Sequence, residues 1–280
     1  MKEISCSAIS ALVEKLCIQA ATVLPEDLCQ VIRDAREKEE SPVGKGILTD
    51  MESNFVMARE KGVPICQDTG MAVVFLELGQ EVHITGGSLT DAINLGVHNG
   101  YLSGCLRCSV VGDPLRRVNT GDNTPAVIHT TIVPGDSLKI TIAPKGFGSE
   151  NMSAMKMFTP AASWENIEDW IVSCVSTAGS NPCPPVVVGV GLGGTVDLCA
   201  LEAKKALLEP NDRPCADSFY AEKEASLLEK INCLGIGPQG MGGRVTALAV
   251  HIHPAATHIA GLPCVVNMSC HVTRHAEGSL

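Results

Sequence analysis

The sequence predicts an α/β (mixed α+β) fold, in which a helical N-terminal region over about residues 1–62 precedes mixed sheets with flanking helices. Two observations predict it. Apolar residues recur at helical spacing through the first sixty residues, and the remaining chain alternates short β-branched runs with amphipathic stretches. With 280 residues, 45% of them hydrophobic, the chain can bury a sizeable core as one large domain or two smaller ones.

The individual elements follow from periodicity and from turn residues. Helices are expected over 7–21, from 25 onward, and over 47–60, 89–100, 164–178, 194–208 and 218–234; strands are expected over 71–76, 126–132, 137–142, 186–190, 246–253 and 262–266. The strands 126–132 and 137–142 flank Pro134-Gly135-Asp136, which predicts a hairpin. The polar residues 274–278 predict a frayed C-terminus.

Charge and hydropathy argue against two classes of partner. The formal net charge is -10 and Lys and Arg do not cluster, which argues against nucleic acid. Apolar stretches are broken by Gly, Pro or charge, so we expect none to reach the roughly 18 residues of a membrane helix. The N-terminus carries acid at once and lacks a long apolar core, which predicts no secretory signal and a cytoplasmic protein.

The chain contains thirteen cysteines, an odd number. Disulfide frameworks belong to small, loop-rich secreted scaffolds, whereas this chain has a large aliphatic core, so we expect reduced thiols. Most of them are predicted core residues, among them Cys17, Cys29, Cys174 and Cys199, which fit apolar stretches. Three others adjoin proline or polar residues at strand ends and are candidates for chemistry: Cys66, Cys183 and Cys270.

Cys66, Gln67 and Asp68 place a thiol, an amide and a carboxylate between a predicted helix and a predicted strand. Loops anchored at both ends by rigid elements commonly carry sites. A neighbouring carboxylate opposes ionisation of a thiol unless a cation or metal offsets it, so one interpretation is a metal ligand. The other is a small buried cysteine followed by a Gln-Asp-Thr-Gly turn.

Several weaker patterns have ordinary alternatives. Arginines at 107, 116 and 117 suit a carboxylate-binding surface but also an ordinary protein surface. The pair Cys105 and Cys108 is a weak zinc signal without a second pair, and the glycines at 191–194 lack the third glycine of a dinucleotide loop. Histidines 251 and 253 share one strand face, where two histidines bind zinc or, more often, hydrogen-bond to neighbours.

Six motifs, in this order along the chain, carry a family resemblance. They are Pro-Ile-Cys-Gln-Asp-Thr-Gly at 64–70, Asn-Thr-Gly-Asp-Asn-Thr-Pro-Ala at 119–126, the segment 145–151, Asn-Pro-Cys-Pro-Pro at 181–185, Gly-Ile-Gly-Pro-Gln-Gly at 235–240 and Asn-Met-Ser-Cys-His at 267–271. Together they resemble the alpha subunit of class I, iron–sulfur-dependent fumarate hydratases, a family that includes tartrate dehydratase alpha subunits. The resemblance covers nearly the whole chain and implies a single domain over 1–280.

The resemblance also implies site residues. Cys66, Cys183 and Cys270 match the three cysteines that hold a [4Fe-4S] cluster whose fourth iron has no protein ligand and acts as a Lewis acid. Asp68 resembles the residue for proton transfer, which also binds substrate. The other predicted substrate-binding residues are Gln67, Arg107, Gly148, Asn151 and His258. Phe147 replaces the glycine usual in the family, which puts the close approach of that loop in doubt.

The implied activity is reversible hydration of fumarate to (S)-malate by an alpha subunit that acts with a beta subunit, as a heterotetramer, on a small dicarboxylate. Residues 148–151 and 106–110 resemble the fumarate enzymes, which favours fumarate. A tartrate or mesaconate-type dehydratase alpha subunit is the alternative within the family. A non-catalytic metal- or thiol-binding scaffold, with the cysteines as core, is the alternative from another class.

Overall fold

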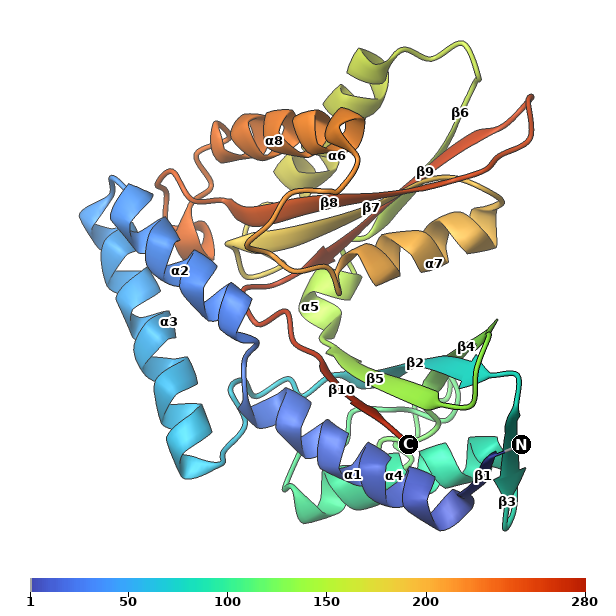
Figure 1. Ribbon diagram of the computed structural model, residues 1–280. Coiled ribbons are helices and arrows are strands. Elements are labelled where there is room, and N and C mark those ends of the chain that lie inside the picture. Colours follow the sequence, from blue (N-terminus) through green and yellow to red (C-terminus); the bar gives the residue numbers. More distant parts are fainter. Residues whose placement is uncertain (1) are drawn as a thin grey trace. The chain divides into compact units, whose positions relative to one another are not determined.

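The computed structural model describes residues 2–280 and confirms the predicted mixed α/β fold with an N-terminal helical region (Figure 1). The chain divides into two compact units. Unit 1 consists of Met1–Pro25, Phe55–Phe147 and Arg274–Leu280, and unit 2 consists of Glu26–Asn54 and Gly148–Thr273. The single-domain organisation that the resemblance implies stays a prediction. Each unit is described by itself below.

The main sheet of unit 1 has the order β10-β5-β2-β4. Its strands are β2 (Met71–Gly79), β4 (Val127–Val133), β5 (Leu138–Lys145) and β10 (Ala276–Ser279), and a separate parallel pair joins β1 (Lys2–Ser5) to β3 (Val82–Thr85). The strand β2 lies between β4, to which it is parallel, and β5, to which it is antiparallel. The apolar strand β2 is therefore central, with partners on both edges.

The predicted hairpin of β4 and β5 is wrong, because β2 separates the two strands. Their connecting turn instead closes over the end of β2: the Gly79 N–H donates to Ser137 O at 2.9 Å, and the Glu81 N–H donates to Gly135 O at 3.0 Å. A side chain at Gly79 would place a Cβ 2.5 Å from Gly135 O. Alternation and turn residues mark the strands but do not show whether a third strand lies between them.

The predicted frayed C-terminus is also wrong. Residues of β10 pair with β5, with Ala276 opposite Ile142, and Arg274 is only 5% exposed. The edge of β5 that faces away from β2 offers backbone donors and acceptors, and a polar strand satisfies them as well as an apolar one. Polar composition therefore does not predict disorder here.

Helices α1 (Cys6–Thr22) and α4 (Leu89–Ser103) pack against each other and supply the helical layer of unit 1. Their close approach depends on glycine: a Cβ at Gly96 would lie 2.6 Å from Ser10 O, and one at Gly100 would lie 2.8 Å from the Cys17 Cβ. Buried residues of both helices and of the sheet form one core, including Ile9, Val13, Leu16, Val74, Ile93, Tyr101 and Ile140.

One stretch, Cys6–Lys38, is long and apolar enough to pass a membrane-span test based on length and composition, contrary to the expectation from the sequence. It comprises two helices, α1 and α2 (Glu26–Lys38). Half of its most apolar 18-residue segment is buried. In α1, Ile9 and Val13 are fully buried in the core of unit 1. Core burial accounts for the buried half of this apolar stretch.

Unit 2 contains a four-stranded sheet of order β6-β9-β7-β8. Its strands are β6 (Ala154–Phe158), β7 (Val186–Gly193), β8 (Ala247–Ala255) and β9 (Leu262–Ser269). The helix α7 (Val196–Ala206) covers one face, while α6 (Trp164–Ala178) and α8 (Ser218–Asn232) cover the other (Figure 1). Gly189 and Gly191 allow α7 to approach β7 closely, because a Cβ at either would lie within 2.2 Å of an α7 carbonyl. The remaining elements are α3 (Pro42–Lys61), α5 (Phe147–Glu150) and the 3-10 turn η1 (Pro238–Gly240).

The strand directions in unit 2 bring two distant segments to one end of the sheet. Because β9 runs antiparallel to β7, its last residue, Ser269, lies opposite Val187 near the start of β7. The residues just before β7 and just after β9 therefore meet at this end. The connection from β8 to β9 lies at the other end, where Ala255 is opposite Gly193.

Candidate functional site

The segment with Cys66, Gln67 and Asp68 joins α3 to β2 in unit 1. The Cys66 thiol lies 3.3 Å from the Gln67 amide oxygen and donates to it. Each oxygen of the Asp68 carboxylate accepts a backbone N–H: Oδ1 from Gly70 at 3.0 Å and Oδ2 from Phe147 at 3.0 Å. An Arg274 guanidinium N–H also donates to the Asp68 carbonyl. These bonds fix the direction of a half-buried carboxylate.

A buried threonine brings Arg107 beside this segment. The Thr69 hydroxyl donates to Arg107 O at 3.0 Å and accepts the Arg107 N–H at 2.9 Å. The Tyr101 hydroxyl donates to the carbonyls of Thr69 and Gly70, at 3.0 and 3.1 Å. The backbone of Arg107 is therefore held next to the Asp68 segment, while its side chain is exposed. An exposed guanidinium is available for a planar anion such as a carboxylate.

Asn123 is a structural residue that the sequence pattern did not single out. It is fully buried, its amide oxygen accepts the N–H groups of Ser109 and Val110 at 2.7 and 3.2 Å, and its amide nitrogen donates to Gly70 O at 3.0 Å. It thus ties the strand start at Gly70 to the segment after Arg107. Its φ of 61° is unusual for a residue other than glycine. Asn tolerates this conformation in turns, so the Asn of a Gly-Asp-Asn-Thr turn is the local signal for it.

The loop after β5 also reaches Asp68. A Cβ at Gly146 would lie 3.2 Å from Asp68 Oδ2, and one at Gly70 would lie 2.8 Å from the Lys145 backbone, so the two segments approach closely. Phe147 stands where the resemblance implies glycine, yet its N–H bonds to Asp68 and its side chain is 48% exposed. The phenylalanine side chain does not block this approach.

Cys183 and Cys270 lie at one end of the sheet in unit 2, on the segments before β7 and after β9. Cys183 is exposed, with a φ of 55°, and its N–H closes a turn onto Ser180 O at 3.0 Å. Cys270 is half-buried, and its carbonyl accepts the Thr273 hydroxyl at 2.8 Å. The ring nitrogen Nδ1 of His271 lies 3.2 Å from Cys183 O, so the two cysteine segments are in direct contact.

Gly148 and Asn151 also belong to unit 2, and both are exposed. A polar network anchors their segment. Lys204 pairs with Glu150 at 2.7 Å, and the amide nitrogen of the buried Asn267 donates to Glu150 at 2.8 Å and to the Ser153 hydroxyl at 2.6 Å. The segment is therefore held against β9 and α7. Asn267, its partner on β9, lies three residues before Cys270.

His258 lies in the connection between β8 and β9, where its exposed ring accepts the Ala260 N–H at 3.1 Å. This is the end of the sheet opposite Cys183 and Cys270, about 25 Å away for the length of β7 at ~3.3 Å per residue. Unit 2 does not bring His258 to the two thiols. Its role in substrate binding stays a prediction.

The zinc interpretation of the two strand histidines gains no support. The His253 ring lies 3.2 Å from a Glu202 oxygen and 3.0 Å from a Glu209 oxygen, one at each ring nitrogen. His251 is only 5% exposed, and burial lowers its pKa to about 4. Among residues 2–280, no group of three or more His, Cys, Asp and Glu side chains is arranged to hold a metal ion.

The predicted cluster ligands are divided between the units. Cys66 belongs to unit 1, whereas Cys183 and Cys270 belong to unit 2, so neither unit alone contains the three thiols. All three are at least partly exposed. By contrast, Cys17 and Cys199 are fully buried, and burial raises the pKa of Cys17 to about 12 and that of Cys199 to about 11. Within residues 2–280 no cysteine forms a disulfide.

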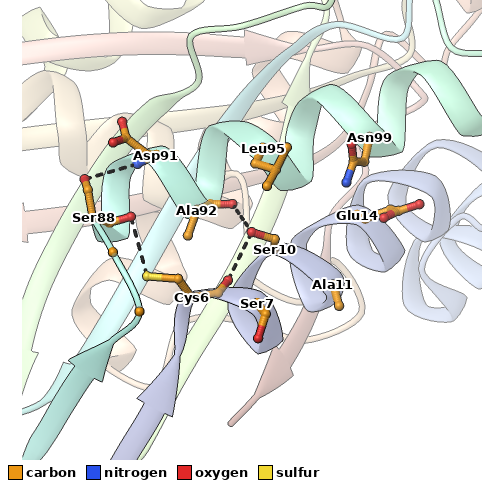
Figure 2. Close-up of a pocket in the computed structure, with 12 residues that line it drawn as sticks. Cys6, Ser7, Ser10, Ala11, Glu14, Ser88, Asp91, Ala92, Leu95 and Asn99 are labelled. Carbon is orange, nitrogen blue, oxygen red and sulfur yellow. Dashed lines mark hydrogen bonds between the residues drawn. The ribbon is translucent and has the colours of Figure 1, made fainter.

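A separate hollow of about 590 Å³ lies on unit 1, at the N-terminal ends of α1 and α4 (Figure 2). In it, the Cys6 thiol lies 3.7 Å from Ser88 O, and the Ser10 hydroxyl donates to Ala92 O at 2.8 Å. Acidic side chains, Glu14 and Asp91, also line it. None of the predicted site residues does, and its acidic lining is unsuited to a dicarboxylate.

Comparison with known proteins identifies the family. The family described as Fumarate hydratase (Fumerase) matches residues 10–279. A protein of Methanocaldococcus jannaschii named "Putative L(+)-tartrate dehydratase subunit alpha" is 40% identical over 274 residues, which cover 96% of each chain. The L(+)-tartrate dehydratase subunits alpha of Escherichia coli O157:H7 and K12 are each 30% identical over 283 residues, which cover 100% of this chain and 92% of theirs. The chain therefore belongs to the fumarate hydratase (Fumerase) family.

Proposed function

We propose that this chain is the alpha subunit of a [4Fe-4S]-dependent hydro-lyase that catalyses the reversible hydration of fumarate to (S)-malate. Membership of the Fumerase family supports a lyase. The observation that carries the proposal is the contact between His271 and Cys183 O, which joins two cysteine segments that are 87 residues apart in the sequence. Cys183 and Cys270 therefore lie on adjoining loops, where both thiolates would serve one cluster.

The donor set fits an iron–sulfur cluster in its chemistry. Thiolates are the preferred protein ligands of such clusters. Cys66, Cys183 and Cys270 all lie on loops next to strands and are at least partly exposed, whereas the core thiols Cys17 and Cys199 are held in the protonated form by burial. The three loop cysteines would therefore hold the cluster. When bound by only three thiolates, a cluster supplies an open iron that acts as a Lewis acid toward a substrate hydroxyl and carboxylate.

We propose that residues of unit 1 take part in hydration of a double bond between two carboxylates. In the direction of malate formation, hydroxide adds to one carbon and a proton to the other; in the reverse direction the proton leaves the carbon next to a carboxylate. Asp68 is proposed to carry this proton, because its carboxylate is oriented by the N–H groups of Gly70 and Phe147. The exposed side chains of Gln67 and Arg107 are proposed to bind the substrate carboxylates.

A beta subunit is the proposed partner. The relatives in Methanocaldococcus jannaschii and Escherichia coli are named as alpha subunits, and this chain matches at least 92% of their length. We propose that the beta subunit supplies the remaining substrate-binding groups and that two pairs form a heterotetramer. The test is to purify the chain with and without co-expressed beta subunit and to measure fumarate hydration by each preparation. Full activity from this chain alone would contradict the need for that partner.

Dehydration of L(+)-tartrate is the second candidate, because the relatives named above are tartrate dehydratase subunits. Tartrate carries one hydroxyl more than malate, so the two substrates differ in the polar groups that the site must match. The deciding measurement is kcat/KM of the assembled enzyme on fumarate, L(+)-tartrate and mesaconate. A tartrate value above the fumarate value reverses our preference, and no activity on any of them overturns the hydro-lyase.

Iron and sulfide quantitation on anaerobically reconstituted full chain tests the cofactor. We expect about four of each per chain, with the visible absorption of a cluster. Replacing Cys66, Cys183 or Cys270 singly with Ser should abolish it, while Cys233→Ser, at an exposed cysteine on the end of α8, should leave it unchanged. A colourless wild-type chain would instead support a non-catalytic scaffold.

A further inference from the structure

The segment Gly235–Gly240 has no role in the proposed function, yet its Gln239 touches both cysteine segments of unit 2. The backbone N–H of Gln239 donates to Pro184 O at 2.7 Å, and its side-chain nitrogen Nε2 donates to the same carbonyl at 2.9 Å. Nε2 also lies 3.4 Å from Nδ1 of His271. One residue thus contacts the neighbour of Cys183 and the neighbour of Cys270.

The backbone of Gln239 is shaped for this double contact. Its φ of 52° and ψ of 19° lie in the left-handed region, which a side chain of this kind seldom adopts. The glycines at 237 and 240 also have positive φ, 70° and 74°, and a Cβ at Gly240 would lie 2.4 Å from the Ser180 Cβ. The turn is therefore pressed against the segment that carries Cys183, and Gln239 lies at its centre.

Hydrogen-bond chemistry assigns the roles of the two polar side chains. Pro184 O only accepts, so the Gln239 amide must present its nitrogen, not its oxygen, to that carbonyl. Cys183 O also only accepts, so a bond from His271 at 3.2 Å requires the hydrogen on Nδ1. The nitrogen of Gln239 at 3.4 Å from Nδ1 is then a packing contact. Three donors converge on two successive carbonyls, those of Cys183 and Pro184.

We propose that Gln239 and His271 are positioning residues that hold the backbone of Cys183 and Pro184 against Cys270, in the arrangement that cluster binding requires. This inference rests on the proposed function. Neither side chain is assigned contact with the cluster or substrate; both act through the backbone carbonyls of Cys183 and Pro184. Loss of a partner that orients a metal ligand typically costs about 10–100-fold in metal affinity or activity.

The test compares matched variants of the full chain. Gln239→Met and His271→Met keep approximate size and remove the donors, whereas His271→Asn places an amide nitrogen near the position of Nδ1 and keeps the donor. Gln30→Met is the control, because Gln30 also makes one side-chain hydrogen bond, to Asp34 within the exposed surface of α2. Circular dichroism checks that each variant folds. If His271→Met does not fold, Gln239→Met, which retains its backbone donor to Pro184, is the variant that decides the test.

Hydrogen exchange of the cluster-free chain, resolved to peptides, measures directly how firmly the backbone around Cys183 and Gln239 is held. Loss of one such hydrogen bond should speed exchange of the Cys183 and Gln239 amides roughly tenfold in both methionine variants, the equivalent of about 1.4 kcal/mol. His271→Asn should exchange within about threefold of wild type, and Gln30→Met should exchange as wild type at these two amides. This measurement does not depend on whether a cluster binds.

The second readout is the rate at which the reconstituted chain loses visible absorption to a chelator. We expect loss roughly tenfold faster in Gln239→Met and His271→Met than in His271→Asn or Gln30→Met. Methionine variants that keep the cluster as long as the control would overturn the positioning role alone. A wild-type chain that takes up no iron or sulfide would overturn the proposed function and the role in cluster binding with it.

Discussion

Glu39 offers the sharpest test of how unit 2 is held together. Its side chain is 1% exposed, and its two oxygens accept four backbone N–H groups: Glu40, Ser41 and Arg244 at 2.8 to 2.9 Å on Oε1, and Val245 at 2.8 Å on Oε2. The bonds to Arg244 and Val245 cross more than 200 residues of sequence. They tie the end of α2 to the approach to β8.

The expected cost of removing this carboxylate follows from those two long-range bonds. A hydrogen bond to a charged group contributes about 1.5–3 kcal/mol, so Glu39→Ala should lower the free energy of unfolding by about 4 kcal/mol after partial rescue by water. Glu39→Gln keeps one acceptor but turns an NH₂ group toward backbone donors, and should cost about 2 kcal/mol. Glu40→Gln is the control: Glu40 is 77% exposed in its pair with Arg244, and should cost under about 0.5 kcal/mol.

Urea unfolding followed by tryptophan fluorescence measures the effect where it occurs, since both tryptophans of the chain, Trp164 and Trp170, lie in α6 of unit 2. The free energies come from linear extrapolation to water. A Glu39→Ala chain within about 1 kcal/mol of Glu40→Gln would refute the reasoning, because four N–H groups around a buried carboxylate could then be lost at almost no cost.

The same carboxylate predicts a pH dependence. Burial raises the pKa of Glu39, but the four N–H bonds outweigh it and lower the pKa below its ordinary value. A carboxyl whose pKa is lowered on folding stabilises the protein above its unfolded pKa, and this contribution is lost as the pH falls through the folded value. Wild type should therefore lose more stability on acidification than Glu39→Gln, in the same fluorescence assay.

Three further predictions concern residues of unit 1, with Gly46 of unit 2 as a comparison, and are checked by urea unfolding with far-ultraviolet circular dichroism. Tyr101→Phe should destabilise by about 1–2 kcal/mol, because the buried hydroxyl donates to two carbonyls just before β2; an unchanged midpoint would contradict this. Gly96→Ala should destabilise by about 1–3 kcal/mol, because the new Cβ would overlap with α1. Gly46→Ala, in α3 with open space around it, should stabilise by about 0.5–1 kcal/mol. Equal effects of the two substitutions would refute the packing argument. Burial raises the pKa of Asp122, but hydrogen bonds, first that from His98, lower it to about 2. Wild type should therefore lose more stability than Asp122→Asn between pH 3.8 and about 2.

The helices were predictable because their signal is local. The helix α6 occupies the predicted residues 164–178, with Ser163 accepting the Asn166 N–H as its N-cap. The central strands β2 and β7 were equally visible as apolar runs. Each of these depends on residues a few positions apart, so one sequence contains the information.

The site was predictable only in part. Cys66, Gln67 and Asp68 attract attention because three reactive groups are adjacent, whereas the grouping of Cys66 with Cys183 and Cys270 came from family resemblance. The structural roles of two amide side chains were missed: Asn123 and Gln239 lie in motifs that carry the resemblance, but neither differs in pattern from an ordinary turn residue. Their importance lies in which carbonyls and N–H groups they reach, and those partners are up to 55 residues away.

By itself, the sequence determined the fold class, the helices and the buried strands, and it marked Cys66, Gln67 and Asp68 as a candidate site, since short-range periodicity and side-chain chemistry suffice for these. Only the tertiary structure decided that β2 separates β4 from β5, that the polar C-terminus forms β10, and that Cys183 meets the segment of Cys270. Strand partners and buried hydrogen bonds are chosen by which distant backbone groups need satisfying, and that choice exists only once the chain has folded.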